Sequence, residues 1–397
     1  MNGYRCFACD ETQAPEYSGW VCPACGGNLD VVNDYDTILE QIRQSPFDTP
    51  RLPLRIGRTP LYAAERLGQS IGLRHLFLKD DTVNPSASSK DRASAAAVLR
   101  ALDMGASTVA VASTGNAGSS LACVAAAAGI DAVVFVPENA PVAKLTQALS
   151  FGATVLAVRG SYDDAFDLCL AASDEFGWFN RSTGFNPFTR EGKKICAWEI
   201  WASLDGRVPD RIVIPTGDGN LLSAMWKGWR ELEAVGLIDH LPKIDCAQSS
   251  GSDAITRTVQ KVRGGSPVDW STVMLEAVDA NTVADSIAVD LPRDGLAAVR
   301  AVIESGGEAV TVPDEAILAA IPEMASHSGI FPEPAAATPW AAVRQMLRDK
   351  EVQADETIVC LVSGNGLKDI ASARSAAGQP QLIDPTLEAV RNTLAKV

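Results

Sequence analysis

From about Leu73 onward, short apolar runs alternate with longer alanine-rich stretches. Each apolar run has the length of a buried strand, and each following stretch has the periodicity of a helix. The pattern predicts strands at residues 75–79, 108–113, 131–137, 153–158, 211–216, 243–248 and 357–363. It also predicts a helix over 90–105 that ends at Gly105, a residue suited to the left-handed turn after a helix.

This alternation of strands and helices is typical of βαβ units, whose strands form mostly parallel, twisted sheets. The chain has 397 residues, which is too long for one compact core, so we expect two α/β domains with a small appendage. No low-complexity linker separates the domains, as happens when one domain is inserted in another. The stretch 281–313 gives no clear prediction.

Composition narrows the possible functions. Hydrophobic residues make up 47% and charged residues 21% of the chain, which is typical of a folded globular protein. The net charge of −15 repels phosphate backbones, so we predict no binding to nucleic acid or to an anionic membrane surface. The best apolar candidate for a span, 119–136, is interrupted by Gly129 and Asp131, and the N-terminus lacks the apolar segment of a signal peptide. These features, with five scattered cysteines, predict a reduced, cytoplasmic protein without a membrane span.

The first thirty residues contain two CxxC turns, formed by Cys6 and Cys9 and by Cys22 and Cys25. A CxxC turn directs two sulfur atoms at one ion, and two such turns complete the tetrahedral thiolate shell of a structural Zn²⁺ site. The metal would fold a segment too short to bury its own core. A site that has lost its metal and a pair of redox dithiols are the alternatives. The residues between the turns include three acids and neither Lys nor Arg, which argues against a ribbon that reads nucleic acid.

Four of the predicted strands are followed by turns rich in Ser, Thr, Gly and Asn, at 80–94, 113–122, 216–224 and 363–369. Such turns open helices, where free backbone N–H groups favour an anion. In the third turn, Gly217 and Gly219 would let the backbone wrap one phosphate, although Asp218 would have to turn its carboxylate away. The turn has neither the P-loop nor the GxGxxG pattern, and an ordinary strand–helix turn is the alternative.

Lys90 lies at a predicted helix start, after Ser88 and Ser89. A cation is disfavoured at that end of a helix, which lowers the pKa of the lysine and frees its amine to act as a nucleophile. A solvated surface lysine is the alternative for this residue taken alone. Together, however, a nucleophilic lysine, an amide side chain, a cradle of backbone amides and a hydroxyl after the last strand are the groups that pyridoxal phosphate requires.

Several motifs match those of one family in order and spacing. They are the CxxC segment followed by GGNLDVVNDYD, then LKDDTVNPSASSKDR, STGN, FNPFTREGKK, the glycine turn, GIFPEPAAA and SGNGLKD. On these motifs the chain resembles threonine synthase and its relatives among the fold-type II (tryptophan-synthase β-like) pyridoxal-phosphate enzymes. The resemblance implies a carbon–oxygen lyase with a large domain formed by 33–95 and 176–397, a smaller inserted α/β domain at 96–175 and a zinc-ribbon-like segment at 1–32.

The resemblance also implies roles for individual residues. Lys90 would form the Schiff base with the cofactor, Asn116 would hydrogen-bond its 3′-oxygen, and Ser363 would face its pyridine nitrogen. The phosphate would be held by the backbone amides of Gly217, Asp218, Gly219, Asn220 and Leu221. A hydroxyl at the ring nitrogen leaves the ring largely neutral, which favours elimination or replacement over transamination.

The substrate pocket departs from the family pattern. Threonine synthases usually have NPTGSFKDRG where this chain has NPSASSKDRA, and they usually have Thr where it has Ala117. The resemblance implies that six residues bind the substrate: Ser88, Ser113, Thr114, Asn186, Arg190 and Lys193. The implied reaction converts O-phosphohomoserine to threonine in a homodimer, with β-replacement on O-phosphoserine (as in cysteate synthase) and dehydration of serine or threonine as alternatives. Glu333 aligns with a family glutamate near the site, although a carboxylate at a helix start is an equal interpretation.

Overall fold

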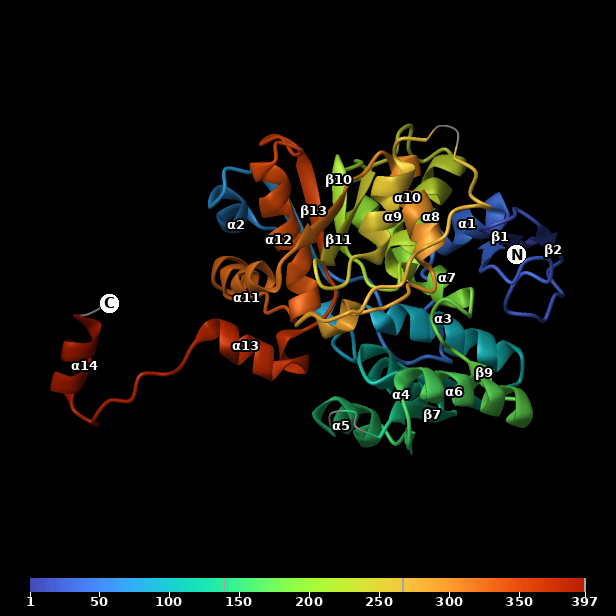
Figure 1. Ribbon diagram of the computed structural model, residues 1–397, viewed down its shortest axis with the longest axis horizontal. Coiled ribbons are helices and arrows are strands. Elements are labelled where there is room, and N and C mark those ends of the chain that lie inside the picture. The colour runs from blue at the N-terminus through green and yellow to red at the C-terminus, as the bar shows by residue number, and fades with distance from the viewer. Residues whose placement is uncertain (139, 141, 266–267, 396–397) are drawn as a thin grey trace.

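The computed structural model describes residues 1–138, 140, 142–265 and 268–395. Its strands form three sheets, of three, six and four strands. Figure 1 shows the six-stranded sheet in the upper body of the molecule, the four-stranded sheet below it and the three-stranded sheet at the N-terminal end. The expected fold class, with two mostly parallel α/β parts and a ribbon-like N-terminal segment, is confirmed.

The six-stranded sheet has the order β12-β11-β10-β13-β5-β4, in which only the edge pair β4 and β5 is antiparallel. Its strands are β4 (Leu61–Ala63), β5 (His75–Asp80), β10 (Arg211–Pro215), β11 (Lys243–Ser249), β12 (Ala309–Val312) and β13 (Thr357–Val362). The carboxyl ends of the parallel strands lie at one edge, which is where ligands bind in open α/β sheets.

The four-stranded sheet has the order β8-β7-β6-β9, and its strands are all parallel. They are β6 (Thr108–Ala112), β7 (Asp131–Pro137), β8 (Thr154–Val158) and β9 (Phe179–Asn180). The smaller sheet therefore extends to residue 180, a few residues beyond the position 175 at which the inserted domain is expected to end.

Helices connect and cover these strands. They are α1 (Tyr35–Arg43), α2 (Glu65–Gln69), α3 (Lys90–Asp103), α4 (Asn116–Ala128), α5 (Val142–Ser150), α6 (Tyr162–Phe176), α7 (Phe188–Ser203), α8 (Asn220–Ala234), α9 (Ala254–Val262), α10 (Gly295–Ser305), α11 (Asp314–Ser328), α12 (Pro334–Arg348), α13 (Ile370–Ala377) and α14 (Leu387–Leu394). Residues of β10 illustrate how both faces of a sheet are covered. Ile212 and Ile214 belong to the core that includes α8, whereas Val213 belongs to the core that includes α12, because successive side chains point to opposite faces.

Glycines let α7 approach its neighbours α3 and α8 closely. A Cβ atom at Gly192 would lie 1.9 Å from the backbone oxygen of Arg92, and one at Gly228 would lie 2.4 Å from that of Lys194. No larger residue fits at either position without moving a helix. This packing fixes α3, whose first residue is Lys90, against α7, which in turn packs against α8.

The two ends of the chain differ in how they pack. The N-terminal strands β1 (Gly3–Cys6), β2 (Thr12–Gln13) and β3 (Leu29–Val32) form an antiparallel sheet beside the large domain. Figure 1 shows α14 at the end of an extended segment that stands away from the body, and none of its residues is buried. Among the described residues, no helix combines the length and apolar character needed to cross a membrane.

All seven predicted strands are confirmed, with ends that differ by at most one residue. The helix predicted over 90–105 is α3, which ends at Asp103, and Gly105 has the left-handed φ of +74° expected of it. The pattern predicts no strand at β1, β2, β3, β4, β9 or β12, each of which is two to four residues long. Strand β12 lies in the stretch 281–313, for which the apolar pattern makes no clear prediction.

Candidate active site

Lys90 is the first residue of α3, and the residues before it are tied to the end of β13. The Ser89 amide donates to the Ser363 carbonyl oxygen over 2.8 Å, and Ser88 forms a β-bridge with Gly364. These contacts bring the lysine segment and the turn that contains Ser363 together at the carboxyl ends of the strands of the large sheet. Burial lowers the pKa of Lys90 from its ordinary value, so a larger share of its amine is neutral and nucleophilic.

Asn116 begins α4 in the smaller domain and reaches across to Glu333 at the start of α12. Its Nδ2 donates to both carboxylate oxygens of Glu333, over 2.8 and 3.1 Å. Gly364 makes room for this carboxylate, because a Cβ atom there would lie 2.1 Å from Glu333 Oε1. Burial raises the pKa of Glu333, while Asn116 and Lys90 act in the opposite direction. Glu333 is therefore in contact with a predicted cofactor-binding residue, in addition to beginning a helix.

The turn between β10 and α8 contains glycines for reasons of backbone conformation and packing. Gly219 has a φ of +92°, and a Cβ atom at Gly217 would lie 2.7 Å from the Cα atom of Ile287. Close packing by the segment around Ile287 therefore requires glycine here, apart from any approach by a phosphate. The first N–H groups of α8 have no acceptor within the helix, so this turn can hold an anion.

Two charged side chains flank this turn. The Lys193 ammonium is buried and donates to Asn220 Oδ1 over 2.7 Å, and no carboxylate of the described residues lies within ion-pair distance of it. Burial lowers its pKa well below the usual value, and two nearby cations act in the same direction. Asp218 accepts from the Arg293 amide over 2.8 Å, and burial, with the charge of Asp294, raises its pKa. A raised pKa favours the protonated carboxyl, which does not repel a phosphate.

Several buried polar atoms in these segments have no hydrogen-bond partner within the described structure. They are the hydroxyls of Ser88, Ser89 and Ser182, the Nη2 of Arg181 and the Oδ2 of Asp218. Buried polar groups are normally paired, so a cluster of unpaired ones marks a place where a ligand supplies partners. Sequence reasoning missed Arg181 and Ser182 because they follow β9, a two-residue strand too short to leave a pattern.

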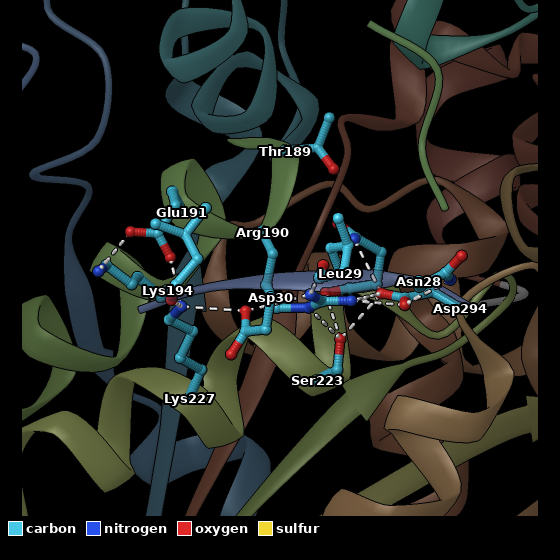
Figure 2. Close-up of polar contacts among 12 residues, drawn as sticks. Asn28, Leu29, Asp30, Thr189, Arg190, Glu191, Lys194, Ser223, Lys227 and Asp294 are labelled. Atoms are coloured by element: carbon cyan, nitrogen blue, oxygen red, sulfur yellow. Dashed lines mark hydrogen bonds and ion pairs between the residues drawn. The ribbon is translucent and has the colours of Figure 1, made fainter. Parts of the chain in front are cut away.

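Arg190 has its hydrogen-bonding groups occupied by the protein. Figure 2 shows its side chain pointing toward Leu29 and Ser223. Its Nη2 lies 2.5 and 2.7 Å from the two carboxylate oxygens of Asp294. Its Nη1 donates to the Leu29 carbonyl and to Asp30 Oδ1, over 3.1 and 3.2 Å, and its Nε donates to Ser223 Oγ. These contacts join the N-terminal segment to the large domain and leave little for a substrate.

The other substrate candidates from the resemblance lie in two places. Asn186 donates to the Asn180 carbonyl over 2.7 Å and so stabilises the turn after β9. Ser113 and Thr114 are half-buried residues between β6 and α4, where Ser113 Oγ accepts from the Gly115 amide over 3.2 Å. Of these three, Ser113 and Thr114 directly precede the Asn116 helix and have side chains that solvent or a ligand can reach.

One further contact between the domains was missed by sequence reasoning. Lys368, in the turn after β13, donates to Ser119 Oγ over 3.2 Å and to Gln147 Oε1 over 2.8 Å. Both acceptors belong to the smaller domain, on α4 and α5. The lysine thus holds the smaller domain against the turn that contains Ser363.

The four N-terminal cysteines are brought together as their spacing predicts. Their sulfur atoms all lie within 4.8 Å of one another, with 3.5 Å between Cys6 and Cys25, 3.7 Å between Cys9 and Cys22 and 3.4 Å between Cys9 and Cys25. A zinc ion with bonds of about 2.3 Å separates tetrahedral sulfur ligands by roughly 3.8 Å. The cluster therefore fits a tetrahedral zinc site.

Comparisons with known proteins agree with this geometry. A family model described as "Pyridoxal-phosphate dependent enzyme" matches residues 52–364. The chain is 35% identical to a threonine synthase of Methanosarcina acetivorans and 32% identical to one of Methanocaldococcus jannaschii, in each case over 99% of both chains. The solved structure of the processed form of threonine deaminase isoform 2 from Solanum lycopersicum has the same fold, with a TM-score of 0.71 at 20% identity, covering 88% of this chain and 94% of that one.

The fold and the lysine-centred site define a pyridoxal-phosphate-dependent lyase of fold type II. Within that class the chain belongs to the threonine synthase-like family, which confirms the resemblance carried by the sequence motifs. The buried lysines, the unpaired donors and the helix start at α8 fit an anionic cofactor that binds covalently to an amine.

Proposed function

We propose that the protein is a threonine synthase, which converts O-phosphohomoserine and water to threonine and phosphate. The observation that carries this proposal is the backbone hydrogen bond that holds the segment before Lys90 against Ser363. It occurs in a chain that matches a threonine synthase over 99% of its length. A hydroxyl rather than a carboxylate at the cofactor ring favours elimination and replacement.

Residues on four segments would hold the cofactor. Lys90 would attach it covalently, Asn116 and Ser363 would contact its ring, and the amides of residues 217–221 would bind its phosphate together with Lys193. When bound, pyridoxal phosphate supplies an electron-withdrawing ring that stabilises negative charge at the Cα atom of the substrate. Glu333 orients the amide of Asn116 through the two hydrogen bonds described above.

Lys90 would also move the Cα proton of the substrate. Burial lowers its pKa, so the neutral amine that can accept a proton is present closer to neutral pH. A protonated amine cannot accept a proton. We therefore expect kcat to rise with pH up to the pKa of Lys90 and then to level off, in a pH profile measured with saturating substrate.

The choice of substrate can be tested with three compounds. We expect O-phosphohomoserine to release phosphate and form threonine. The variant Lys90→Ala should not turn over this compound, and borohydride should no longer attach the cofactor covalently to the protein. Phosphate release from O-phosphoserine alone, with incorporation of sulfite, would favour β-replacement instead. Turnover of threonine alone, giving 2-oxobutyrate and ammonia, would contradict the synthase assignment and favour a dehydratase.

Ser88, Ser113 and Thr114 would contact the substrate. Ser88 has a buried hydroxyl without a partner in the described structure, and the other two directly precede the Asn116 helix. Asn186 and Arg190 would act instead on the local structure, because their side chains bond to the protein.

We also propose one structural zinc ion per chain, bound by Cys6, Cys9, Cys22 and Cys25. Four thiolates leave no coordination position for a substrate, so the metal would stabilise the ribbon only. Metal analysis of the purified protein should find one zinc per chain and less in Cys25→Ser. Absence of zinc from protein purified without chelators would contradict the proposal.

The expected cytoplasmic location and homodimeric assembly stay predictions. The five cysteines outside the ribbon are free and buried, which suits a reducing compartment. Sedimentation of the purified protein would establish its assembly state.

A further inference from the structure

Arg181 differs from the other buried arginines in what surrounds its charge. Three buried arginines pair with carboxylates at 2.5 to 3.2 Å: Arg92 with Asp81 and Glu199, Arg190 with Asp294 and Asp30, and Arg211 with Asp245 and Glu356. Arg181 is fully buried, and no carboxylate in the described parts of the chain lies within 4 Å of it. The carboxylates of Asp91 and Asp218 act on its charge from beyond that distance. A buried cation without a directly bonded anion is costly, because it loses its hydration and gains little from more distant charges.

The hydrogen bonds of Arg181 go to neutral groups and leave one nitrogen free. Its Nε donates to Ser94 Oγ over 3.3 Å and its Nη1 donates to Thr183 Oγ1 over 2.9 Å. Its Nη2 has no partner within the described residues. Burial lowers the pKa of Arg181 to about 10, which still leaves it charged at neutral pH.

The location of Arg181 links it to the reacting amine. Its partner Ser94 lies four residues after Lys90 on α3, and therefore one turn along the same face of the helix. The charge of Arg181 lowers the pKa of Lys90, which places the two cations within electrostatic range. The hydroxyls of Ser182, which follows Arg181, and of Ser88, two residues before Lys90, are also buried without partners in the described structure.

The phosphate of the cofactor has a cation of its own. Lys193 contacts Asn220 at the start of α8, where the amides of the glycine turn lie. Arg181 contacts side chains of α3 and of the turn after β9 instead. The site therefore offers two cations that make no ion pair in the described structure and that contact different segments, which suits a cofactor and a substrate that each carry a phosphate.

We propose that Arg181, assisted by the hydroxyls of Ser182 and Ser88, binds the phosphate of the substrate and thereby selects phosphate esters over free hydroxy amino acids. This inference rests on the proposed function and names the residue that determines its specificity. In the reaction, the Cγ–O bond of the ester breaks and its electron pair leaves with the oxygen, as inorganic phosphate. Cβ loses one proton and Cγ gains one, water adds its hydroxyl group to Cβ, and the remaining proton of that water neutralises one charge of the departing phosphate. Arg181 stabilises the charge on the departing phosphate and does not transfer a proton.

The direct test measures binding of inorganic phosphate to the holoenzyme by calorimetry. Losing a charged hydrogen-bonding partner costs on the order of 10- to 100-fold in affinity, so we expect this loss in Arg181→Gln and a smaller one in Arg181→Lys. Arg159→Gln, which removes an exposed arginine from the same domain, should bind phosphate like the wild type. Arg181 makes no ion pair in the described structure, so its removal leaves no carboxylate without a directly bonded partner, and we expect Arg181→Gln to keep the wild-type circular dichroism spectrum.

A second measurement separates Arg181 from the cofactor. The apparent affinity of the apoenzyme for pyridoxal phosphate should be unchanged in Arg181→Gln and reduced in Lys193→Gln. The proposal is overturned if Arg181→Gln binds phosphate as tightly as the wild type, if wild-type holoenzyme binds no phosphate, or if Arg181→Gln mainly loses cofactor affinity.

Kinetics then distinguish this inference from the proposed function. With O-phosphohomoserine, Arg181→Gln should raise KM by a factor similar to its loss of phosphate affinity. If the wild type does not turn over this compound and phosphate binding still depends on Arg181, the proposed function fails and the phosphate site stands.

Discussion

Arg190 and Arg181 lie nine residues apart in the sequence and are both buried, yet they occupy opposite kinds of environment. Arg190 is bonded on all sides, by Asp294, by Asp30 and by the edge of the N-terminal ribbon. Among the described residues, Arg181 has two hydroxyl partners, and its Nη2 has none. A buried charge whose partners come from the protein joins two parts of the structure, whereas one whose partner is missing indicates a ligand.

The same contrast separates two lysines on α7. Lys194 donates to Glu191 and Glu231 over 2.8 and 2.9 Å. It therefore belongs to the network of charged residues, shown in Figure 2, that connects the large domain to the N-terminal segment 1–32. Lys193 bonds only to the amide of Asn220 among the described side chains. Of these adjacent residues of one helix, Lys194 therefore contacts the network at the N-terminal segment and Lys193 the proposed cofactor site. A sequence motif that contains both lysines cannot separate these roles.

The largest effect that tests this contrast is on the stability of the apoprotein. Arg190→Met leaves the carboxylate of Asp294 buried with its main partner lost, and we expect a loss of about 3–5 kcal/mol. Arg181→Met removes an unpaired charge and should be neutral or stabilising. Urea unfolding followed by tryptophan fluorescence measures both. Equal losses in the two variants would remove the distinction between a structural and a ligand-binding arginine.

A smaller effect should appear in acid. Burial acts to raise the pKa of Glu191, but Lys194 and Lys227 outweigh it and lower the pKa to about 2, from an ordinary value of 4.5. The pKa of Glu191 is lower in the folded than in the unfolded protein. Its contribution to the free energy of unfolding is therefore fully present above about pH 4.5 and is lost as the pH falls toward 2. The contribution is on the order of 3 kcal/mol.

The measurement is the pH dependence of the urea midpoint between pH 6 and the lowest pH at which the protein stays soluble. The variant Glu191→Gln should be less stable at pH 6 and should show a shallower decline in acid. A decline as steep as that of the wild type would assign the acid sensitivity to other carboxyl groups.

Much of the fold follows from local sequence. Most of the seven apolar runs form strands that are buried on both faces, and such parallel strands need continuous apolar residues. The exception is β8 (Thr154–Val158), an edge strand without a buried residue. Strands β4 and β12 lie at the two edges of the large sheet and β9 at an edge of the small one, so their sequences are less apolar or too short to form a pattern. The CxxC turns brought their four sulfurs together because each turn is a local structure.

The partners of buried charges could not be predicted in this way. Asp294 is 104 residues from Arg190 in the chain, and Glu333 is 217 residues from Asn116. Such pairs are set by how whole helices and strands pack. The absence of a partner at Arg181 is a property of that packing too, so it is visible only in the folded chain.

The smallest expected effect concerns the contact between Asn28, in the N-terminal segment 1–32, and the Arg190–Asp294 ion pair. Asn28 Nδ2 donates to Asp294 Oδ1 over 3.1 Å and to the Arg293 carbonyl over 2.6 Å. Asn28→Ala removes both bonds, but Asp294 keeps Arg190, so we expect a loss of only about 1 kcal/mol. The same substitution at Asn392, in the exposed helix α14, should leave the urea midpoint unchanged. A loss in Asn28→Ala as large as that in Arg190→Met would mean that the ribbon, rather than the arginine, holds Asp294 in place.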